Sequence, residues 1–471
     1  MRDDDLPPGW AEASVQDLAS PEPRPITDGP FGSNLKTAHY TPEGPRVIRL
    51  QNIGELRFVD DRAHISQEHF ESLSAHSVRP NDVLIAGLGE QLPRSCLAPS
   101  FIGSAIVKAD CFRVRTHPEI VPAYLCALLN SPQVRSASSA RISGVGRPRL
   151  NLQKVREIRI PVPPTKEQDR IVAAIEEQFS RLDAGLAALT RVQQDLKRMR
   201  AAILLAAVTG QLVRDDNSEP TQSGSHTDWS WQPLEAIITR LRNGVFVSRP
   251  GAQPIGQPIL RISAVRSMTL DICDVRYVST SAMPDRPEDF FLAGGDLLFT
   301  RYSGNPEFVG ACAMVPMNVP RLLYPDKLIR VQVDRAAVEP RFVEIAASAG
   351  ATRRTIRSRV KTTAGQTGIS GSDLKSVLFP VPSLDVQRRI IQVVDHAMSD
   401  IGRLEDAVAT GAQRSSSLRS SILAAAFRGK LASQDPHDEP APVLLDRIAA
   451  GRTASNGSKP TSGRTRTRSN E

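Results

Sequence analysis

The chain has 471 residues, well beyond the ~150 residues of a typical domain, so we expect at least two domains. Its 59 lysines and arginines outnumber its 51 acidic residues, and the net charge of +8 favours polyanionic partners such as nucleic acid. The five cysteines form no C-x-x-C pair, which argues against a zinc ribbon or a disulfide framework and suits a reducing cytosol. No segment reaches the ~18 to 20 apolar residues of a membrane span, so we predict a cytoplasmic protein with no membrane partner.

The first 164 residues are predicted to form a mixed α/β domain. They are rich in proline, glycine and short alternating runs, a pattern typical of strands joined by turns. Strands are predicted within residues 47–53 and 105–114. A helix is predicted over 122–129, because proline suits the first turn of a helix.

Residues 165–213 have the pattern of one long helix. Apolar residues recur there at steps of three and four, the spacing of a seam along one helix face, and Gly210 suits a left-handed C-terminal cap. About forty helical residues make a rod of roughly 60 to 65 Å, which is longer than the core of a small domain. The predicted seam residues are Ile171, Ile175, Phe179, Leu182, Leu189, Leu196, Met199 and Ile203.

The same plan follows a second time. A polar linker is predicted over 214–227 and a second mixed α/β domain over 228–383, with a strand at 327–333 and a helix at 340–349. Residues 384–432 then form a second long helix, whose seam weakens where the sequence turns to alanine, glycine and serine. Its predicted seam residues are Ile390, Val394, Met398, Ile401, Val408, Leu418 and Ile422.

The C-terminal segment, residues 433–471, is predicted to be largely disordered. It is rich in proline, aspartate, glycine and serine, and it ends in serine, threonine, glycine and arginine. Within it, only residues 443–450 form a short amphipathic run.

An internal repeat relates the two halves. The motif Pro-Val-Pro at 161–163 returns at 380–382, and this separation of 219 residues then holds without a gap for some fifty residues. Two related rods can bury their seams against each other. The predicted fold is therefore α+β, with two mixed α/β domains separated by two long antiparallel coiled-coil helices and an internal pseudo-two-fold repeat.

The sequence offers no convincing catalytic or metal site. The nearest match to the loop of an amino-methyltransferase is Asn-Pro-Glu-Phe at 305–308, where glutamate replaces the required second proline, and a phosphate-binding G-x-x-x-x-G-K-[ST] loop is absent. His64 and His69 lie close together, but no cysteine and carboxylate set completes a zinc site. We therefore predict neither catalytic nor metal-binding residues.

Basic residues gather at matching places in the two halves, just before each Pro-Val-Pro motif. One such run is ordinarily a solvated face, but two runs at equivalent positions suggest contacts with DNA phosphates, which position a protein without reading sequence. The predicted DNA-binding residues are Arg141, Arg147, Arg149, Lys154, Arg353, Arg354, Arg357, Arg359 and Lys361.

On these repeated segments, the chain resembles the specificity subunit of type I restriction-modification enzymes from residue 6 to residue 431. Its strongest motifs are Ile-Pro-Val-Pro-Pro at 160–164 with the helix that follows, and the second copies of both. The resemblance implies two variable target recognition domains, each reading a few base pairs of a split, asymmetric DNA site. It also implies two conserved helices that act as a ruler and dock two modification subunits.

In such complexes, the resemblance implies that methylation and cleavage belong to other subunits, which bring S-adenosylmethionine, ATP and Mg²⁺. This chain would hold none of these cofactors and would not itself be an enzyme. Its partners would be double-stranded DNA, two modification (methyltransferase) subunits and, through the complex, restriction/translocase subunits. Two alternatives stay open: a single-chain methyltransferase or nuclease with an unrecognised site, and a coiled-coil scaffold without a DNA role.

Overall fold

The computed structural model describes residues 6–139, 148–213, 229–248, 250–363 and 366–457. The chain divides into two compact units. The first unit comprises Met1–Ala188 and Gly411–Glu471, and the second unit comprises Leu189–Thr410. Each unit therefore holds one α/β domain together with part of each long helix. The predicted linker at 214–227 lies outside the described residues.

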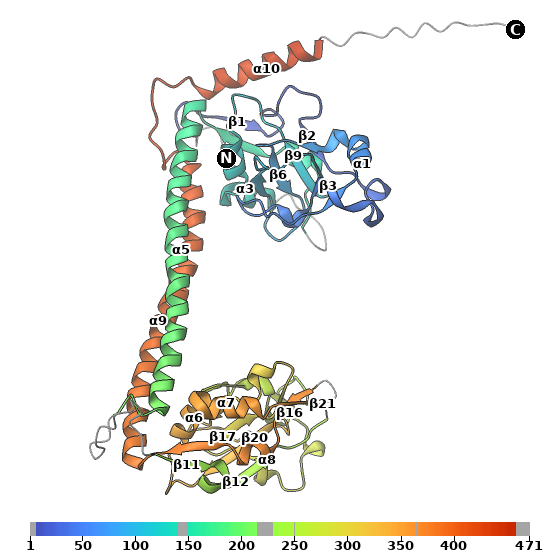
Figure 1. Cartoon of the computed structure of the whole chain (residues 1–471). Coiled ribbons are helices and arrows are strands. Elements are labelled where there is room, and N and C mark those ends of the chain that lie inside the picture. The colour runs from blue at the N-terminus through green and yellow to red at the C-terminus, as the bar shows by residue number, and fades with distance from the viewer. Residues whose placement is uncertain (1–5, 140–147, 214–228, 249, 364–365, 458–471) are drawn as a thin grey trace, which may run out of the picture. The chain divides into compact units, whose positions relative to one another are not determined.

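The first unit is built on a four-stranded antiparallel sheet of order β2-β9-β6-β7 (Figure 1). All four residues of β6 (Val83–Ala86) are buried, and Val83 lies opposite Val114 of β9 (Cys111–Val114). The edge strands are β2 (Ile26–Asp28) and β7 (Arg94–Leu97). Helix α2 (Pro122–Leu129) packs on β6 and β7, which confirms the predicted helix.

A second sheet in this unit has the order β4-β3-β8-β5, in which β3 and β8 are parallel. Its strands are β4 (His64–Ile65), β3 (Tyr40–Ile48), β8 (Ala105–Val107) and β5 (Ser77–Val78). The short helices of the unit are α1 (Gln67–Ser72), α3 (Pro132–Ser139) and α4 (Leu152–Arg156).

Two predicted strands of the first unit were too long. The strand expected over 47–53 stops at Ile48, because Leu50–Asn52 forms a 3-10 turn in which the Asn52 side chain accepts the Arg49 N–H at 2.8 Å. The strand expected over 105–114 is two strands, β8 and β9, separated by a turn in which Asp110 has φ 65°. In both places a polar side chain or a left-handed residue ends the strand.

The second unit repeats the main sheet with the order β12-β20-β17-β19. Its strands are β12 (Ile238–Asn243), β20 (Leu328–Val333), β17 (Leu297–Thr300) and β19 (Cys312–Met314). Helices α6 (Pro340–Ser348), α7 (Gly350–Ser358) and α8 (Gly371–Lys375) follow in the order of α2, α3 and α4. The predicted strand at 327–333 and the predicted helix at 340–349 are each confirmed to within one residue.

Smaller strand sets complete the second unit. Two antiparallel pairs are formed by β13 (Gln257–Leu260) with β16 (Val275–Val278) and by the hairpin of β14 (Val265–Arg266) and β15 (Thr269–Leu270). A three-stranded ribbon has the order β18-β22-β21 and consists of β18 (Tyr302–Ser303), β22 (Gln366–Gly368) and β21 (Lys361–Thr363).

In each unit a short antiparallel pair precedes the long helix. Strand β1 (Ala11–Ser14) pairs with β10 (Arg159–Val162), and β11 (Ser230–Pro233) pairs with β23 (Leu378–Val381). The two pairs have the same register, since Glu12 lies opposite Pro161 and Trp231 lies opposite Pro380. The sequence repeat of 219 residues is therefore a repeat of hydrogen-bond register as well.

Two buried glutamines make the same junction in both units. The Gln168 Oε1 accepts the Val121 N–H at 2.9 Å, and its Nε2 donates to the Pro163 carbonyl at 3.1 Å. The Gln387 side chain accepts the Glu339 N–H and donates to the Pro382 carbonyl, both at 2.8 Å. Each glutamine thereby ties the start of a long helix to the start of the helix that covers its sheet.

The long helices are α5 (Thr165–Val208) and α9 (Leu384–Ala426). Both are continuous, including residues 410–417 of α9, where the seam is weakest, and Gly210 and Gly429 take left-handed φ values of 71° and 67° after their ends. Within the first unit, Arg419 of α9 forms an ion pair with Asp183 of α5. Within the second unit, Arg200 of α5 bonds Glu405 of α9 at 3.1 Å.

These contacts make the two helices antiparallel within each unit. In the first unit, the N-terminal end of α5, with Ile171 and Ile175, shares a core with Leu423 of α9. In the second unit, the C-terminal end of α5, with Leu204, shares a core with Val386. The predicted antiparallel direction of the two helices is thereby confirmed within each unit.

Most predicted seam residues are fully or partly buried. Met199 and Leu418 are not, since they are 52% and 50% exposed, and for these two positions the seam prediction was wrong. In α9 the buried position is Ser415, seven residues after Val408 and seven before Ile422. The heptad spacing is kept there by a polar residue, which an analysis of apolar residues does not detect. Fully or partly buried are Ile171, Ile175, Phe179, Leu182, Leu189, Leu196, Ile203, Ile390, Val394, Met398, Ile401, Val408 and Ile422.

The C-terminal segment is ordered over much of its length, which corrects the prediction of a largely disordered tail from 433. Helix α10 (Ala441–Gly457) packs on the first unit through buried Ala441, Leu444 and Ile448. The preceding residues are held as well, because Asp438 forms an ion pair with Arg170 of α5. Three apolar residues at helical spacing and this ion pair supply the contacts that composition alone did not reveal. Residues 458–471 lie outside the described part of the chain.

Candidate nucleic-acid interface

The second basic cluster lies on α7 and β21 and contains both structural and exposed arginines. The Arg353 side chain donates to the carbonyls of Val309 at 3.1 Å and Glu307 at 2.8 Å, and burial lowers the pKa of its guanidinium. Its neighbour Arg354 is exposed. Adjacent residues on a helix point about 100° apart, so one arginine fixes the 306–309 turn while the next faces outward.

Three further cations of this cluster are paired. Arg357 forms an ion pair with Glu307, the Arg359 guanidinium donates to the Ser376 hydroxyl at 2.6 Å, and Lys361 bonds Asp373 at 3.2 Å. The Ser370 hydroxyl and Lys361 lower the pKa of the Asp373 carboxyl, which therefore stays ionised. The Lys361 side chain is still 71% exposed, so its ion pair lies at the surface.

The first cluster is described only in part. Arg141 and Arg147 lie outside the described residues. Arg149 is 56% exposed and forms an ion pair of 2.7 Å with Asp110, the residue of the β8–β9 turn. Lys154 lies on α4, where its backbone N–H is capped by the Asn151 side chain at 2.8 Å.

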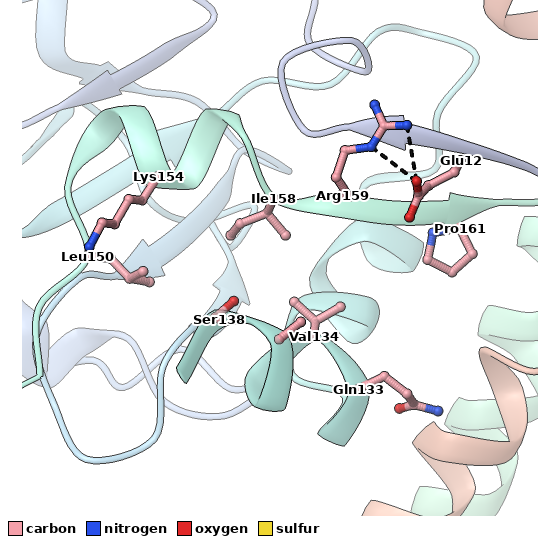
Figure 2. Close-up of a pocket in the computed structure, with 10 residues that line it drawn as sticks. Glu12, Gln133, Val134, Ser138, Leu150, Lys154, Ile158, Arg159 and Pro161 are labelled. Carbon is pink, nitrogen blue, oxygen red and sulfur yellow. Dashed lines mark hydrogen bonds and ion pairs between the residues drawn. The ribbon is translucent and has the colours of Figure 1, made fainter. Parts of the chain in front are cut away.

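A cavity of about 480 Å³ opens beside α4 and is lined by residues of α3, α4 and β10 (Figure 2). Val134 and Ile158 line it with apolar side chains, and Lys154 of α4 lines it as well. The Arg159 guanidinium donates twice to the Glu12 carboxylate, at 3.2 and 3.1 Å, so this basic residue is neutralised across the β1–β10 pair.

A stacked group beyond the end of β17 lies outside the predicted basic runs. The Tyr302 ring lies under two cations, with the Arg301 Cζ 4.7 Å and the Lys327 Nζ 5.4 Å from its centre. The buried Nε of Arg301 has no hydrogen-bond partner among the residues that the structure describes. These residues are single basic positions in sequence. The signal that locates them is the end of the strand at 297–300, where Arg301 follows directly.

The segment that most resembles a methyltransferase loop is a structural turn. Asn305 caps a 3-10 helix, Pro306–Phe308, by accepting the Glu307 N–H at 3.0 Å, and Glu307 itself is held by Arg353 and Arg357. The Asn305 cap and the bonds to Glu307 thus give this segment a structural role. Within the described residues, no group of three or more histidine, cysteine, aspartate or glutamate side chains could hold a metal ion. In the same part of the chain, no helix combines the length and hydrophobicity that crossing a bilayer requires.

The fold is shared with solved structures. A chain from a structure on complex assembly and conformational transition of the type I restriction-modification system matches with a TM-score of 0.64 and 19% identity, covering 90% of this chain and 99% of that chain. The HsdS subunit from Thermoanaerobacter tengcongensis matches with a TM-score of 0.52 and 20% identity, covering 90% and 98%. These likenesses support the fold of two recognition domains with long helices.

Sequence relatives identify the family. A model described as the type I restriction modification DNA specificity domain matches residues 102–193. The EcoKI specificity subunit of the type I restriction enzyme of Escherichia coli K12 is 31% identical over 96% of this chain and 98% of its own length. The StySPI specificity subunit from Salmonella potsdam is 26% identical, also over 96% and 98%. The chain therefore belongs to the specificity subunits of type I restriction enzymes, the non-catalytic components of these complexes.

Proposed function

We propose that this chain recognises a split, asymmetric DNA sequence, with residues 1–164 and 228–383 as two target recognition domains that each read one half-site. The supporting observation is the repeated sheet, which has the same strand order in both units, while the segments around it differ. A repeated domain on DNA resembles a dimer on a palindrome. Two copies with different loops read two different sequences instead.

The paired helices would set the gap between the half-sites. Helix α5 has 44 residues, which at ~1.5 Å per residue make a rod of roughly 65 Å. One turn of B-DNA is ~34 to 36 Å, so such a rod corresponds to somewhat under two turns. By this proposal, a fixed stretch of unread base pairs separates the half-sites.

The same helices would dock the partner subunits. A structural relative comes from work on complex assembly of the type I restriction-modification system, which supports a role in assembly for this chain as well. We infer that two modification subunits and, through the complex, restriction/translocase subunits bind here. Those partners would bring S-adenosylmethionine, ATP and Mg²⁺.

Phosphate contacts would come from the exposed members of the two basic clusters. Lys154, Arg354 and Lys361 are exposed or partly exposed, as a contact with the DNA backbone requires. Arg149 is exposed as well and stays a DNA-binding candidate, in contact with either a phosphate or a base. Arg141, Arg147, Arg357 and Arg359 remain candidates for the same role. Arg353 does not belong to this set, because its guanidinium donates to backbone carbonyls of the protein.

Domain replacement tests this function directly. Residues 1–164 are exchanged for the equivalent segment of a relative, and the modified sites are mapped genome-wide in cells that contain the modification subunits. We expect one half-site to change and the other to persist. A change in both half-sites, or in neither, would contradict the modular assignment. Omitting this chain should abolish site-specific methylation.

The two alternatives give different results. A single-chain methyltransferase would transfer label from radioactive S-adenosylmethionine to DNA when purified alone, whereas we expect no transfer. A coiled-coil scaffold without a DNA role would leave the assembled complex without salt-dependent DNA binding.

A further inference from the structure

Near the C-terminal ends of β6 and β17, three positions make the same backbone hydrogen bonds in both units but have different side chains. The equivalence follows from hydrogen bonds. In the first unit, the Gly87 N–H donates to the Asp110 carbonyl at 2.7 Å, and the Leu150 N–H donates to the Gly87 carbonyl at 2.8 Å. Leu88 and Arg149 then form an antiparallel bridge.

The second unit repeats each of these bonds. The Arg301 N–H donates to the Lys327 carbonyl at 2.8 Å, and the Ile369 N–H donates to the Arg301 carbonyl at 2.9 Å. Tyr302 and Gly368 form the antiparallel bridge. Leu88, Asp110 and Arg149 of the first unit are therefore equivalent to Tyr302, Lys327 and Gly368 of the second, and we call these sets the first and second triads.

Away from the triads, before β6 and β17 and in the strands beside them, several positions keep the same residue type in both units. Asp82 and Asp296 precede the two central strands and accept the N–H of Arg79 and Ala293, at 2.7 and 2.8 Å. Both units also bury an arginine in the strand beside the central one, Arg113 in the first and Arg330 in the second. These positions are the same in both copies, whereas the side chains beyond the ends of β6 and β17 differ.

Within each triad the side chains depend on one another. Arg149 extends to Asp110, whereas in the second unit Tyr302 and Lys327 form a stacked pair. Gly368 permits that stacking, because a Cβ at this position would lie 2.3 Å from the Tyr302 ring. An arginine at 368 and a tyrosine at 302 therefore exclude each other, and each triad changes as a set.

Both triads adjoin the exposed basic residues. Arg149 is itself a member of the first cluster and is 56% exposed. In the second unit, Lys361 lies directly opposite Gly368 in the β21–β22 pair, and its side chain is 71% exposed. A β-ribbon of this size fits the major groove of B-DNA, where each base pair presents a distinct set of donors and acceptors.

We propose that the two triads are specificity-determining positions, at which the two domains read different bases; this rests on the proposed DNA-reading function. Arg149, oriented by the Asp110 carboxylate, presents a planar fork suited to the O6 and N7 of a guanine in the first half-site. In the second triad, the Lys327 ammonium and the Tyr302 hydroxyl offer a different set of donors and acceptors at the equivalent place. The two half-sites accordingly differ at the base pair that each triad contacts.

The test uses the full chain assembled with its modification subunits and a library of duplexes with randomised half-sites. Arg149→Ala should weaken the preference for one G·C pair in one half-site, on the order of tenfold to a hundredfold, and leave the other half-site unchanged. Converting the second triad to the first, with Tyr302→Leu, Lys327→Asp and Gly368→Arg together, should change the preference only in the second half-site. If this triple variant does not fold, Lys327→Ala should relax the same position.

The matched control is Arg335→Gln, an exposed cation at the other end of β17, where its guanidinium reaches the Gly294 carbonyl at 3.4 Å. We expect this control to keep both preferences. Unchanged preferences in Arg149→Ala and Lys327→Ala would overturn the proposal, and so would a uniform loss of affinity for all sequences, which marks phosphate contacts only. Failure of the proposed function itself gives another result, since the unaltered complex would then select no sequence.

Discussion

Two buried glutamines, equivalent in the sequence repeat, make equivalent hydrogen bonds in the two units. Gln168 and Gln387 are both completely buried. Gln168 satisfies one backbone N–H and one backbone carbonyl, and Gln387 satisfies one backbone N–H and two carbonyls, those of Ala337 and Pro382. Gln168→Ala leaves the Val121 N–H without its partner, so we expect the free energy of unfolding to fall by about 1–3 kcal/mol. Chemical denaturation monitored by circular dichroism measures this change.

The control for that variant is Gln153→Ala, which removes an exposed side chain on α4 that, among the described residues, bonds Glu157. This control should change stability by less than about 0.5 kcal/mol. Equal effects of the two variants would show that the buried junction contributes nothing specific.

Substitutions of two adjacent arginines on α7 should have different effects, one on stability and the other on DNA binding. Arg353→Ala removes two bonds to backbone carbonyls, so it should lower the thermal midpoint. Arg354→Ala removes an exposed cation. It should leave the midpoint unchanged, weaken DNA binding of the assembled complex for all sequences, and reduce the slope of log affinity against log salt by about 1.

These measurements combine thermal unfolding with a salt titration of DNA binding. Loss of DNA affinity in Arg353→Ala without loss of stability would reverse the assignment of the two arginines. The sequence groups these residues as one basic run, and only the helix surface separates them. The charge pattern therefore identifies a basic segment but not which of its side chains are free to face outward.

Elements with strong periodicity could be predicted from the sequence, and elements held by distant contacts could not. The spacing of apolar residues along α5 and α9 defines two long helices and their pairing, and prolines mark the starts of α2 and α6. The ribbon β18-β22-β21 could not be predicted from such patterns, because its strands have only two or three residues and β18 pairs with β22 across more than 60 positions of the chain. The ribbon forms through contacts between distant segments, which local sequence patterns do not specify.

Helix α10 is the element whose contribution is most open to test. Leu444 and Ile448 are buried on the first unit, and burying an aliphatic side chain of this size contributes about 1.5–3 kcal/mol. The Arg447 guanidinium also bonds Glu119, and the Ala441 N–H donates to the Gly9 carbonyl at 2.8 Å. Truncation after residue 440 should therefore destabilise the first unit by a few kcal/mol.

Hydrogen exchange shows which part of the chain loses stability when α10 is removed. Amides of β1 in the first unit should exchange faster in the truncated chain, while those of β11 in the second unit should keep their rates. Truncation after residue 457 retains the helix and should match the full chain. Unchanged exchange in β1 after the shorter truncation would mean that α10 adds nothing to the stability of its unit.

At the scale of the whole molecule, the proposed ruler can be tested through the length of the paired helices. Inserting seven residues into both α5 and α9, near the boundary between the units at Ala188 and Gly411, keeps the heptad seam in phase. Each helix becomes about 10.5 Å longer, which corresponds to roughly three base pairs of B-DNA. We expect the methylated sites to have a gap about three base pairs wider, with both half-sites unchanged.

Insertion into α5 alone is the control, because it shifts one seam against the other and should abolish site-specific methylation. Mapping of methylated sites in cells reads out both variants. An unchanged gap in the double insertion would refute the ruler, even if both half-sites were still read. A widened gap would show that the spacing of the two readers on DNA is set by helix length and not by the loops of either domain, since those loops are the same in both proteins.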